Sequence, residues 1–252
     1  MRLTVVGCSG SFPGPDSAAS CYLLEAPYDD RTYRLLLDLG SGALGPLQRH
    51  VELESIDAVA LTHLHADHCL DLCGLFVVCR YHPGGPMGPL RVHGPAGTAD
   101  RIAAAYGLDE RSGMSQAFDF HTYPEGPFEI GPFEVSVTRV DHPGTAYAIR
   151  VSHGDRTLVY SGDTGPCTSL EQLAKGCDVL LAEASFVDEP GNPPNLHLTG
   201  KEAAQVAERA GVGRLLLTHV PPWHDRETIL AEAQPHFGGE TSLALPGRTL
   251  DV

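Results

Sequence analysis

The stretch "LTHLHADHCLD", residues 61–71, decides how this chain folds and what chemistry it can perform. It follows the apolar run "IDAVA", which predicts a strand ending near His63, and it continues into a predicted helix beginning near Asp67. His63 and His65, two apart in an extended segment, can point the same way and share one metal ion. Asp67 and His68 diverge at the helix start and can serve a second ion.

A purely structural interpretation has Asp67 capping the helix and the histidines exposed on a loop. It could explain one of these residues, but not all four together. Four ligands cannot fill two metal shells, so the metal hypothesis requires more ligands downstream. His142 in "RVDHPGTAYAI", Asp163 in "VYSGDTG" and His219 in "LLLTHVPPW" meet that requirement. The sequence predicts one ion bound by His63, His65, His142 and Asp163, and another bound by Asp67, His68, Asp163 and His219.

The composition sets limits on partners and location. With 252 residues, 42% of them hydrophobic, the chain can form one α/β domain over residues 1–252. A net charge of −15 argues against stable nucleic-acid binding or attachment to anionic membranes. The chain has no signal-like N-terminus and no apolar window long enough to span a bilayer, so we expect a cytoplasmic protein. Its seven cysteines are then expected to be reduced.

Short apolar runs alternate with helical patterns along the whole chain, which is typical of α/β folds. Strands are predicted at "RLTVVG", "YRLLLDLG", "DAVALTH", "FEVSVTRV", "TLVYSGD", "DVLLAEA" and "RLLLTHV". Helices are predicted near residues 41–50, 67–80, 97–106, 168–175, 199–210 and 224–234. Polar residues end several strands: Asp38, His63, Asp163, Glu183 and His219. Ligands bind at that edge of open α/β sheets, and two similar sheet layers sharing one edge would bring these residues together.

"THLHADH" matches the H-x-H-x-D-H motif of the metallo-β-lactamase fold. With "VVGCSGSFPGPDSAASCYLL", "YSGDTGPC", "LAEASF" and "HLTGKEAAQVAERAGV", the chain resembles the phosphodiesterase branch of that fold, which includes ribonuclease Z. The resemblance implies a four-layer αββα sandwich with two divalent metal ions at the shared edge of its sheets. Zinc is the usual metal, with Mn²⁺ or Fe²⁺ as alternatives. The resemblance also favours a homodimer.

Two further residues receive roles from this resemblance. It implies that Glu183 orients His197, and that His197 contacts a substrate phosphate oxygen or protonates the leaving oxygen. With Asp67, these residues form the predicted catalytic set. The alternative has Glu183 in a surface salt bridge and His197 packed on a helix whose start, Thr199 to Glu202, has the pattern of a capping box.

The sequence constrains the substrate less than it constrains the metal ligands. Segments such as "HLHADHCLDL" and "LLTHVPPW" resemble compact actinobacterial phosphodiesterases, which implies hydrolysis of cyclic AMP, and of cyclic GMP as a second substrate, to 5′-nucleotides. Bacterial ribonuclease Z carries a tRNA-gripping arm after the motif of the third histidine, and the segment from His142 to Asp163 has no room for it. A tRNA 3′-processing endonuclease, a thiolester or lactam hydrolase, and a non-enzymatic binding protein remain alternatives.

Three weaker signals lie outside this set. Trp223, the only tryptophan, follows His219 closely and could stack on a nucleobase, or it could simply cover the domain edge. The spacing of Cys69, Cys73, Cys79 and His82 could suggest a structural zinc, but Cys79 points further round the predicted helix. His93, in a predicted strand-to-helix turn, is expected to be structural.

Overall fold

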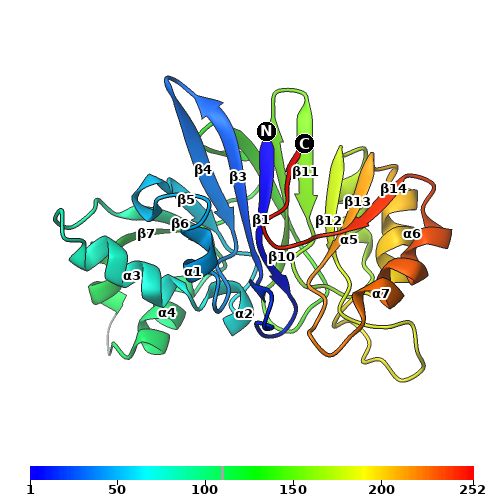
Figure 1. Ribbon diagram of the computed structural model, residues 1–252. Coiled ribbons are helices and arrows are strands. Elements are labelled where there is room, and N and C mark those ends of the chain that lie inside the picture. Colours follow the sequence, from blue (N-terminus) through cyan, green and yellow to red (C-terminus); the bar gives the residue numbers. More distant parts are fainter. Residues whose placement is uncertain (109–110) are drawn as a thin grey trace.

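The computed structural model describes residues 1–108 and 111–252, and it contains two β-sheets that pack face to face (Figure 1). The strands of the first sheet are β1 (Arg2–Ser9), β2 (Ala18–Ala19), β3 (Cys21–Tyr28), β4 (Arg31–Leu37), β5 (Ala58–Ala60), β6 (Leu90–Gly94), β7 (Phe118–Thr122) and β15 (Thr249–Asp251). The strands of the second are β8 (Phe128–Ile130), β9 (Phe133–Arg139), β10 (Tyr147–His153), β11 (Arg156–Tyr160), β12 (Val179–Glu183), β13 (Arg214–Thr218) and β14 (Glu240–Leu243).

Helices cover the outer face of each sheet (Figure 1). Those on the first sheet are α1 (Leu44–Leu47), α2 (Ala66–Cys69), α3 (Leu72–Tyr81) and α4 (Thr98–Tyr106). Those on the second are α5 (Thr168–Ala174), α6 (Gly200–Ala210) and α7 (Arg226–Ala233). Short 3-10 turns complete the elements: η1 (Leu53–Ser55), η2 (Arg111–Gln116) and η3 (Gln234–His236).

Three hydrophobic clusters show that these elements form four layers. Leu36 faces the helices of the first sheet, whereas its neighbours Leu35 and Leu37 face the second sheet. In the second sheet, Leu181 faces inward and Leu180 faces the helices. Side chains alternate across a strand, so strands buried on both faces are apolar at every position. The predicted αββα sandwich is confirmed.

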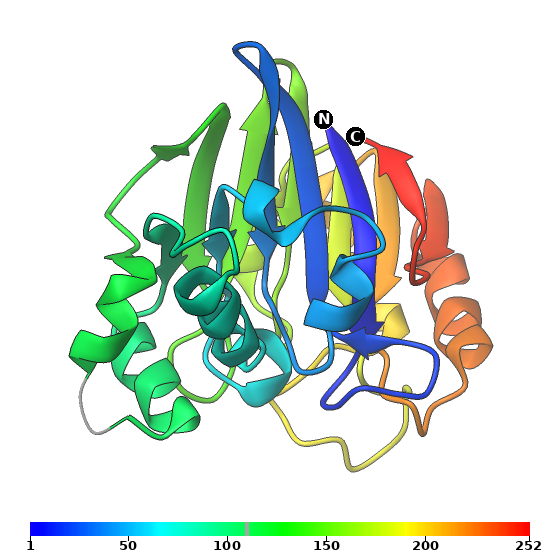
Figure 2. The ribbon, with the colours of Figure 1, turned by 60° about the vertical axis from the view of Figure 1, so that its left-hand side comes forward.

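The two sheets repeat the same strand arrangement. In the first, β1, β3 and β4 are antiparallel, and β5, β6 and β7 then continue parallel to β4. In the second, β9, β10 and β11 are antiparallel, and β12, β13 and β14 continue parallel to β11. The terminal strands β1 and β15 lie side by side (Figure 2).

The strand register determines which residues meet at the functional edge. Leu37 of β4 pairs with Ala60 of β5, so Asp38 follows its strand beside the start of the histidine motif. In the second sheet, Glu183 of β12 pairs with Thr218 of β13. The carboxyl ends of the parallel strands therefore bring the polar strand-end residues to one edge, as predicted.

Two predicted helices differ from the structure. The helix expected over residues 67–80 is split into α2 and α3, because the backbone N–H of Asp71 donates to the backbone oxygen of Leu39 instead of to a residue one helical turn earlier. The helix expected near residues 41–50 is reduced to the four residues of α1. The capping box of α6 is confirmed, since Thr199 and Glu202 exchange both side-chain-to-backbone hydrogen bonds.

Two negative predictions can be compared with the structure. Within the described residues, no helix is both long and apolar enough to cross a bilayer. All seven cysteines are free in the structure.

Candidate metal centre

Histidine and aspartate side chains from both sheets converge at their shared edge. The β5–α2 connection and α2 supply four of them, and the loops after β9, β11 and β13 supply one each. They form two groups with a common member: His63, His65, His142 and Asp163 in the first, and Asp67, His68, Asp163 and His219 in the second. The structure thus brings all seven predicted metal ligands together in the predicted pairing.

The first group surrounds a point between three imidazole rings. Nδ1 of His65 lies 3.0 Å from Nε2 of His63 and 3.2 Å from Nε2 of His142. Oδ2 of Asp163 lies 3.7 Å and 3.9 Å from those Nε2 atoms, respectively. Ligand atoms of a tetrahedral zinc ion are about 3.4 Å apart, given zinc–nitrogen bonds of about 2.1 Å. These separations match that spacing.

The second group has similar dimensions. Nε2 of His68 lies 3.1 Å from Oδ1 of Asp163 and 3.5 Å from Oδ2 of Asp67. Nε2 of His219 lies 3.3 Å from Oδ2 of Asp163 and 3.6 Å from Oδ2 of Asp67. Asp163 therefore directs oxygen atoms toward both groups, as a carboxylate shared by two cations would.

The hydrogen bonding around the cluster supports a metal rather than a closed polar network. Nε2 of His68 and Oδ1 of Asp163 are buried and lack a hydrogen-bond partner among the described residues, although they are only 3.1 Å apart. Buried polar atoms are normally satisfied, so two such atoms facing one point indicate a missing partner. A divalent cation fits these donor atoms, and the chain has a His/Asp cluster that could bind metal.

Hydrogen bonds from residues around the cluster orient the rings of His142 and His219 with Nε2 facing the other ligands. Nδ1 of His142 donates to the backbone oxygen of Leu196 at 2.7 Å. Nδ1 of His219 lies 2.9 Å from the hydroxyl of Ser20. Such partners select the tautomer that leaves Nε2 free for a metal.

Asp38 is the centre of the largest of these outer networks. Its carboxylate lies 2.7 Å from Nδ1 of His68 and accepts hydrogen bonds from the backbone N–H and hydroxyl of Thr62 and from the hydroxyl of Tyr160. The sequence identified Asp38 as a polar strand end but gave it no role. Tyr160, Thr62 and Ser20 carried no sequence signal.

Two residues of the centre have left-handed backbone conformations. Asp38 has φ 59° and His219 has φ 56°, each directly after a parallel strand. Left-handed conformations are unfavourable for non-glycine residues and persist where surrounding contacts enforce them, often at functional sites. Both turns direct a side chain toward the cluster.

Burial and charge set the protonation of the metal-free cluster. Burial lowers the pKa of His63, and the neighbouring His68 lowers it further. Burial opposes protonation of His68, but the negative charges of Asp163 and Asp38 outweigh it and raise the pKa. Burial alone would raise the pKa of Asp163, whereas His219 and His68 lower it well below its ordinary value. The aspartate is therefore ionised, as a metal ligand must be.

Glu183 and His197 form a pair beside the cluster. Oε1 of Glu183 lies 2.9 Å from Nδ1 of His197, and the carboxylate also accepts hydrogen bonds from the backbone N–H groups of Thr164 and Ser185. Glu183 is fully buried, so the alternative of a surface salt bridge is wrong. Burial opposes protonation of His197, but Glu183 and then Asp163 outweigh it and raise the pKa to about 9.

The imidazole of His197 lies between the two groups. Its ring centroid is 5.3 Å from that of His142 and 5.8 Å from that of His219. Nδ1 is occupied by Glu183, so Nε2 is the nitrogen available to a molecule bound at the cluster.

The remaining sequence signals lie outside the cluster. Trp223 is exposed in the loop between β13 and α7. The metal-competent groups among the described residues do not include the cysteines, and burial raises the pKa of Cys69 to about 12 and that of Cys79 to about 11. His93 stacks on His121 with centroids 5.0 Å apart, away from the seven ligands.

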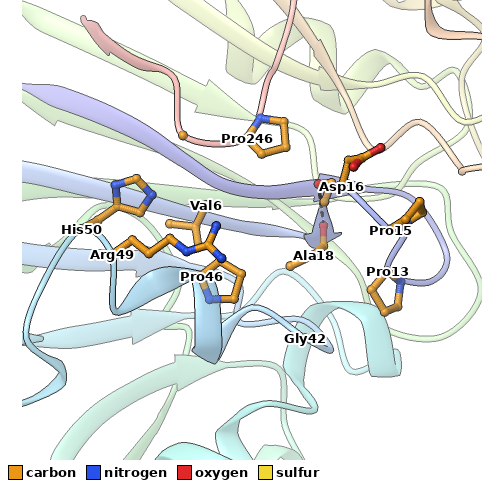
Figure 3. A pocket seen from close by; sticks show the side chains of 13 residues that line it. Val6, Pro13, Pro15, Asp16, Ala18, Gly42, Pro46, Arg49, His50 and Pro246 are labelled. Atoms are coloured by element: carbon orange, nitrogen blue, oxygen red, sulfur yellow. Dashed lines mark hydrogen bonds between the residues drawn. The ribbon is translucent and has the colours of Figure 1, made fainter.

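The cavity in Figure 3 does not contain the centre. It has a volume of about 450 Å³ and is lined mainly by the β1–β2 loop, the α1 region and the turn before β15. None of the seven ligand side chains lines it. The candidate metal centre is therefore identified by the convergence of ligand side chains and not by this cavity.

Comparisons with known proteins agree with this geometry. Residues 33–220 match the family model of the β-lactamase superfamily domain. A protein of Mycobacterium leprae is 48% identical over 257 residues, covering 100% of this chain and 89% of that protein. Ribonuclease Z of a Mycobacterium species is 31% identical, covering 88% of this chain and 85% of that protein.

A solved structure supports the same assignment. The probable metallo-hydrolase YhfI of Bacillus subtilis is 32% identical, with 98% of each chain covered. Its crystal structure, described as a metallo-β-lactamase fold protein, gives a TM-score of 0.87 at 30% identity, covering 99% of this chain and 98% of that one. The chain belongs to the β-lactamase superfamily and is a metallo-hydrolase of the metallo-β-lactamase fold.

Proposed function

We propose that this metallo-hydrolase is a phosphodiesterase that opens 3′,5′-cyclic nucleotides, cyclic AMP above all, to 5′-nucleotides. The observation that carries the proposal is the double ligand group sharing Asp163, with the Glu183–His197 pair beside it. A pair of adjacent cations suits a phosphodiester, because it can neutralise charge on the phosphate while a proton donor serves the leaving oxygen.

The bound ions would be held by the two ligand groups, and they would supply Lewis acidity and lower the pKa of a water molecule. The chain itself orients the other participants. Glu183 holds the proton on Nδ1 of His197, so Nε2 faces the bound phosphate. A water oxygen bonds to phosphorus and releases a proton to solvent as the bond between phosphorus and the 3′ oxygen breaks. A protonated His197 donates its Nε2 proton to that leaving oxygen, and the phosphate stays on the 5′ carbon. Asp67 serves as a ligand of the second group and orients that side of the site.

The small size of the loops near the site favours a compact substrate. The segment between His142 and Asp163 is filled by β10 and β11, which are joined by a tight turn at Gly154 and Asp155. A tRNA-gripping arm is therefore absent from that position. The net charge of −15 also disfavours an extended phosphate polymer, whereas two local cations would attract a single phosphate group.

A tRNA 3′-processing endonuclease is the second candidate. It is favoured by the 31% identity to a ribonuclease Z over most of both chains. The two candidates share the catalytic groups and differ in the surface that binds the rest of the substrate.

A substrate panel with metal-loaded protein tests the proposal. The panel contains cyclic AMP, cyclic GMP, bis(p-nitrophenyl) phosphate and a β-lactam. We expect hydrolysis of the three phosphodiesters and none of the lactam, with loss of activity in Asp163→Ala. Asp178→Asn is the matched control, because Asp178 accepts a backbone hydrogen bond at the opposite end of the second sheet. Turnover of the lactam alone would overturn the proposal.

A further inference from the structure

Two large aromatic side chains touch each other on the surface. The ring centroids of Phe12 and Trp223 lie 4.9 Å apart, with an interplanar angle of 44°. Trp223 is 65% exposed and Phe12 is 39% exposed, so each ring keeps a face open to solvent. An exposed aromatic pair of this kind can bind a flat apolar group.

The pair lies beside the second ligand group. The backbone nitrogen of Ser11, the residue before Phe12, is 3.4 Å from Nε2 of His219, which is a ligand atom of that group. Trp223 follows His219 by four residues. Given the 3.8 Å spacing of consecutive Cα atoms, the Cα atom of Trp223 lies within roughly 15 Å of the Cα atom of His219. A nucleotide bound through its phosphate could place its base against the two rings.

The loops that carry the rings are packed against each other. The amide of Gly10 donates to the backbone oxygen of Val220 at 3.1 Å, and a Cβ on Gly10 would lie 2.2 Å from the oxygen of His219. The hydroxyl of Ser9 donates to the backbone oxygen of Phe12 at 2.8 Å. Only glycine permits this close approach of the two backbones.

Prolines restrict both loops further. Pro13 and Pro15 follow Phe12 and line the cavity of Figure 3. Pro221 and Pro222 precede Trp223, and a Cβ on Gly14 would lie 3.1 Å from Cγ of Pro222. Proline fixes φ, so the backbone of both loops has few alternative conformations and less entropy is lost when a ligand orders them.

We propose that Phe12 and Trp223 form a stacking platform for the base of the nucleotide whose phosphate lies at the ligand cluster. The inference rests on the proposed function and adds a specificity determinant to it. Stacking on aromatic rings tolerates different bases, because every base has a π face. The platform therefore selects nucleotides over phosphate esters without a base, and discriminates weakly between adenine and guanine.

Product binding tests the platform separately from catalysis. Zinc-loaded protein is titrated calorimetrically with AMP and with ribose 5-phosphate, which carries the same phosphate but no base. AMP should bind about tenfold or more tightly, and Phe12→Ala or Trp223→Ala should remove that advantage while leaving ribose 5-phosphate unchanged. Phe12→Leu keeps an apolar side chain that can maintain the loop packing but has no aromatic ring. It should also lose the preference for AMP, which separates an effect of stacking from an effect of altered loop structure.

Fluorescence gives a second readout, because Trp223 is the only tryptophan of the chain. AMP should change its emission, and ribose 5-phosphate should not. Tyr81→Ala is the matched control, since Tyr81 is 66% exposed at the end of α3 and should not influence AMP affinity. Equal affinity of wild type for the two ligands, or equal weakening of both in the Phe12 and Trp223 variants, would overturn the platform.

The test distinguishes this inference from the proposed function. If AMP stacks as expected but cyclic AMP is not hydrolysed, the platform stands and the proposed substrate is wrong. If cyclic AMP is hydrolysed but AMP and ribose 5-phosphate bind alike, only the platform is wrong.

Discussion

Oε1 of Glu183 lies 2.9 Å from Nδ1 of His197, and this contact joins a fully buried carboxylate to an imidazole between the two ligand groups. Because the carboxylate is also held by two backbone N–H groups, it cannot turn away from the histidine. The pair therefore presents one defined nitrogen, Nε2, to the substrate.

Replacement of His197 should impair chemistry without removing the ligands. We expect His197→Ala to lower kcat for a phosphodiester by about 10²–10⁴, the usual range for a lost general acid or base. Metal content, measured by plasma emission spectrometry, should stay at the wild-type level. If metal content fell together with activity, His197 would be a metal ligand and the assigned role would be wrong.

The pH profile should report the charge of Glu183. If His197 acts as the proposed proton donor, its active form is protonated, and with its pKa raised to about 9 activity should fall as the pH rises through that region. Bound cations would repel the protonated His197 and lower its pKa, so this loss of activity would begin at a lower pH. In Glu183→Gln the negative charge that raises the pKa of His197 is absent. The pH above which activity falls should therefore be lower than in the wild type by more than about one unit. Profiles of kcat at saturating metal measure the shift, and identical profiles in the two proteins would contradict the role of Glu183.

Metal stoichiometry should follow the two ligand groups. The loaded chain should contain two divalent ions, and His63→Ala combined with His142→Ala should retain one, because only the first group loses ligands. Chelation should abolish hydrolysis, and added metal should restore it. A wild type that saturates at one ion, or a double variant that still binds two, would refute the shared-Asp163 arrangement.

Asp38 should control metal affinity through His68. Asp38→Asn replaces the charged acceptor of Nδ1 of His68, and loss of such an outer partner typically weakens metal binding 10–100-fold. Competition with a chromogenic chelator measures the change. Asp178→Asn, the same substitution at the far end of the second sheet, should leave the affinity unchanged. Equal effects of the two substitutions would assign Asp38 a purely structural role.

The ligand set could be predicted from sequence because four members come after recognisable strands, and the other three lie with His63 in the motif "HLHADH". His63, Asp163 and His219 come directly after apolar runs whose parallel packing forces their ends to one edge. The residues that form hydrogen bonds around the ligands could not be predicted in this way. The hydrogen bond from Tyr160 to Asp38 joins residues 122 positions apart, and no local pattern marks it.

Other features also depended on long-range contacts. The break between α2 and α3 arises because the backbone N–H of Asp71 donates to the backbone oxygen of Leu39, which a helical pattern over residues 67–80 cannot reveal. The contact of Phe12 with Trp223 joins the first and last quarters of the chain. Tertiary geometry was needed to find both.

The most direct test of the central claim is a side-by-side comparison of cyclic AMP and a precursor tRNA as substrates of the zinc-loaded protein. Low salt is used, because it favours any weak tRNA binding. We expect a far higher kcat/KM for cyclic AMP, with 5′-AMP as the product, since the proposed protonation by His197 makes the 3′ oxygen the leaving group. Efficient 3′ processing of the tRNA with negligible turnover of cyclic AMP would contradict it and identify the chain as an armless tRNA endonuclease.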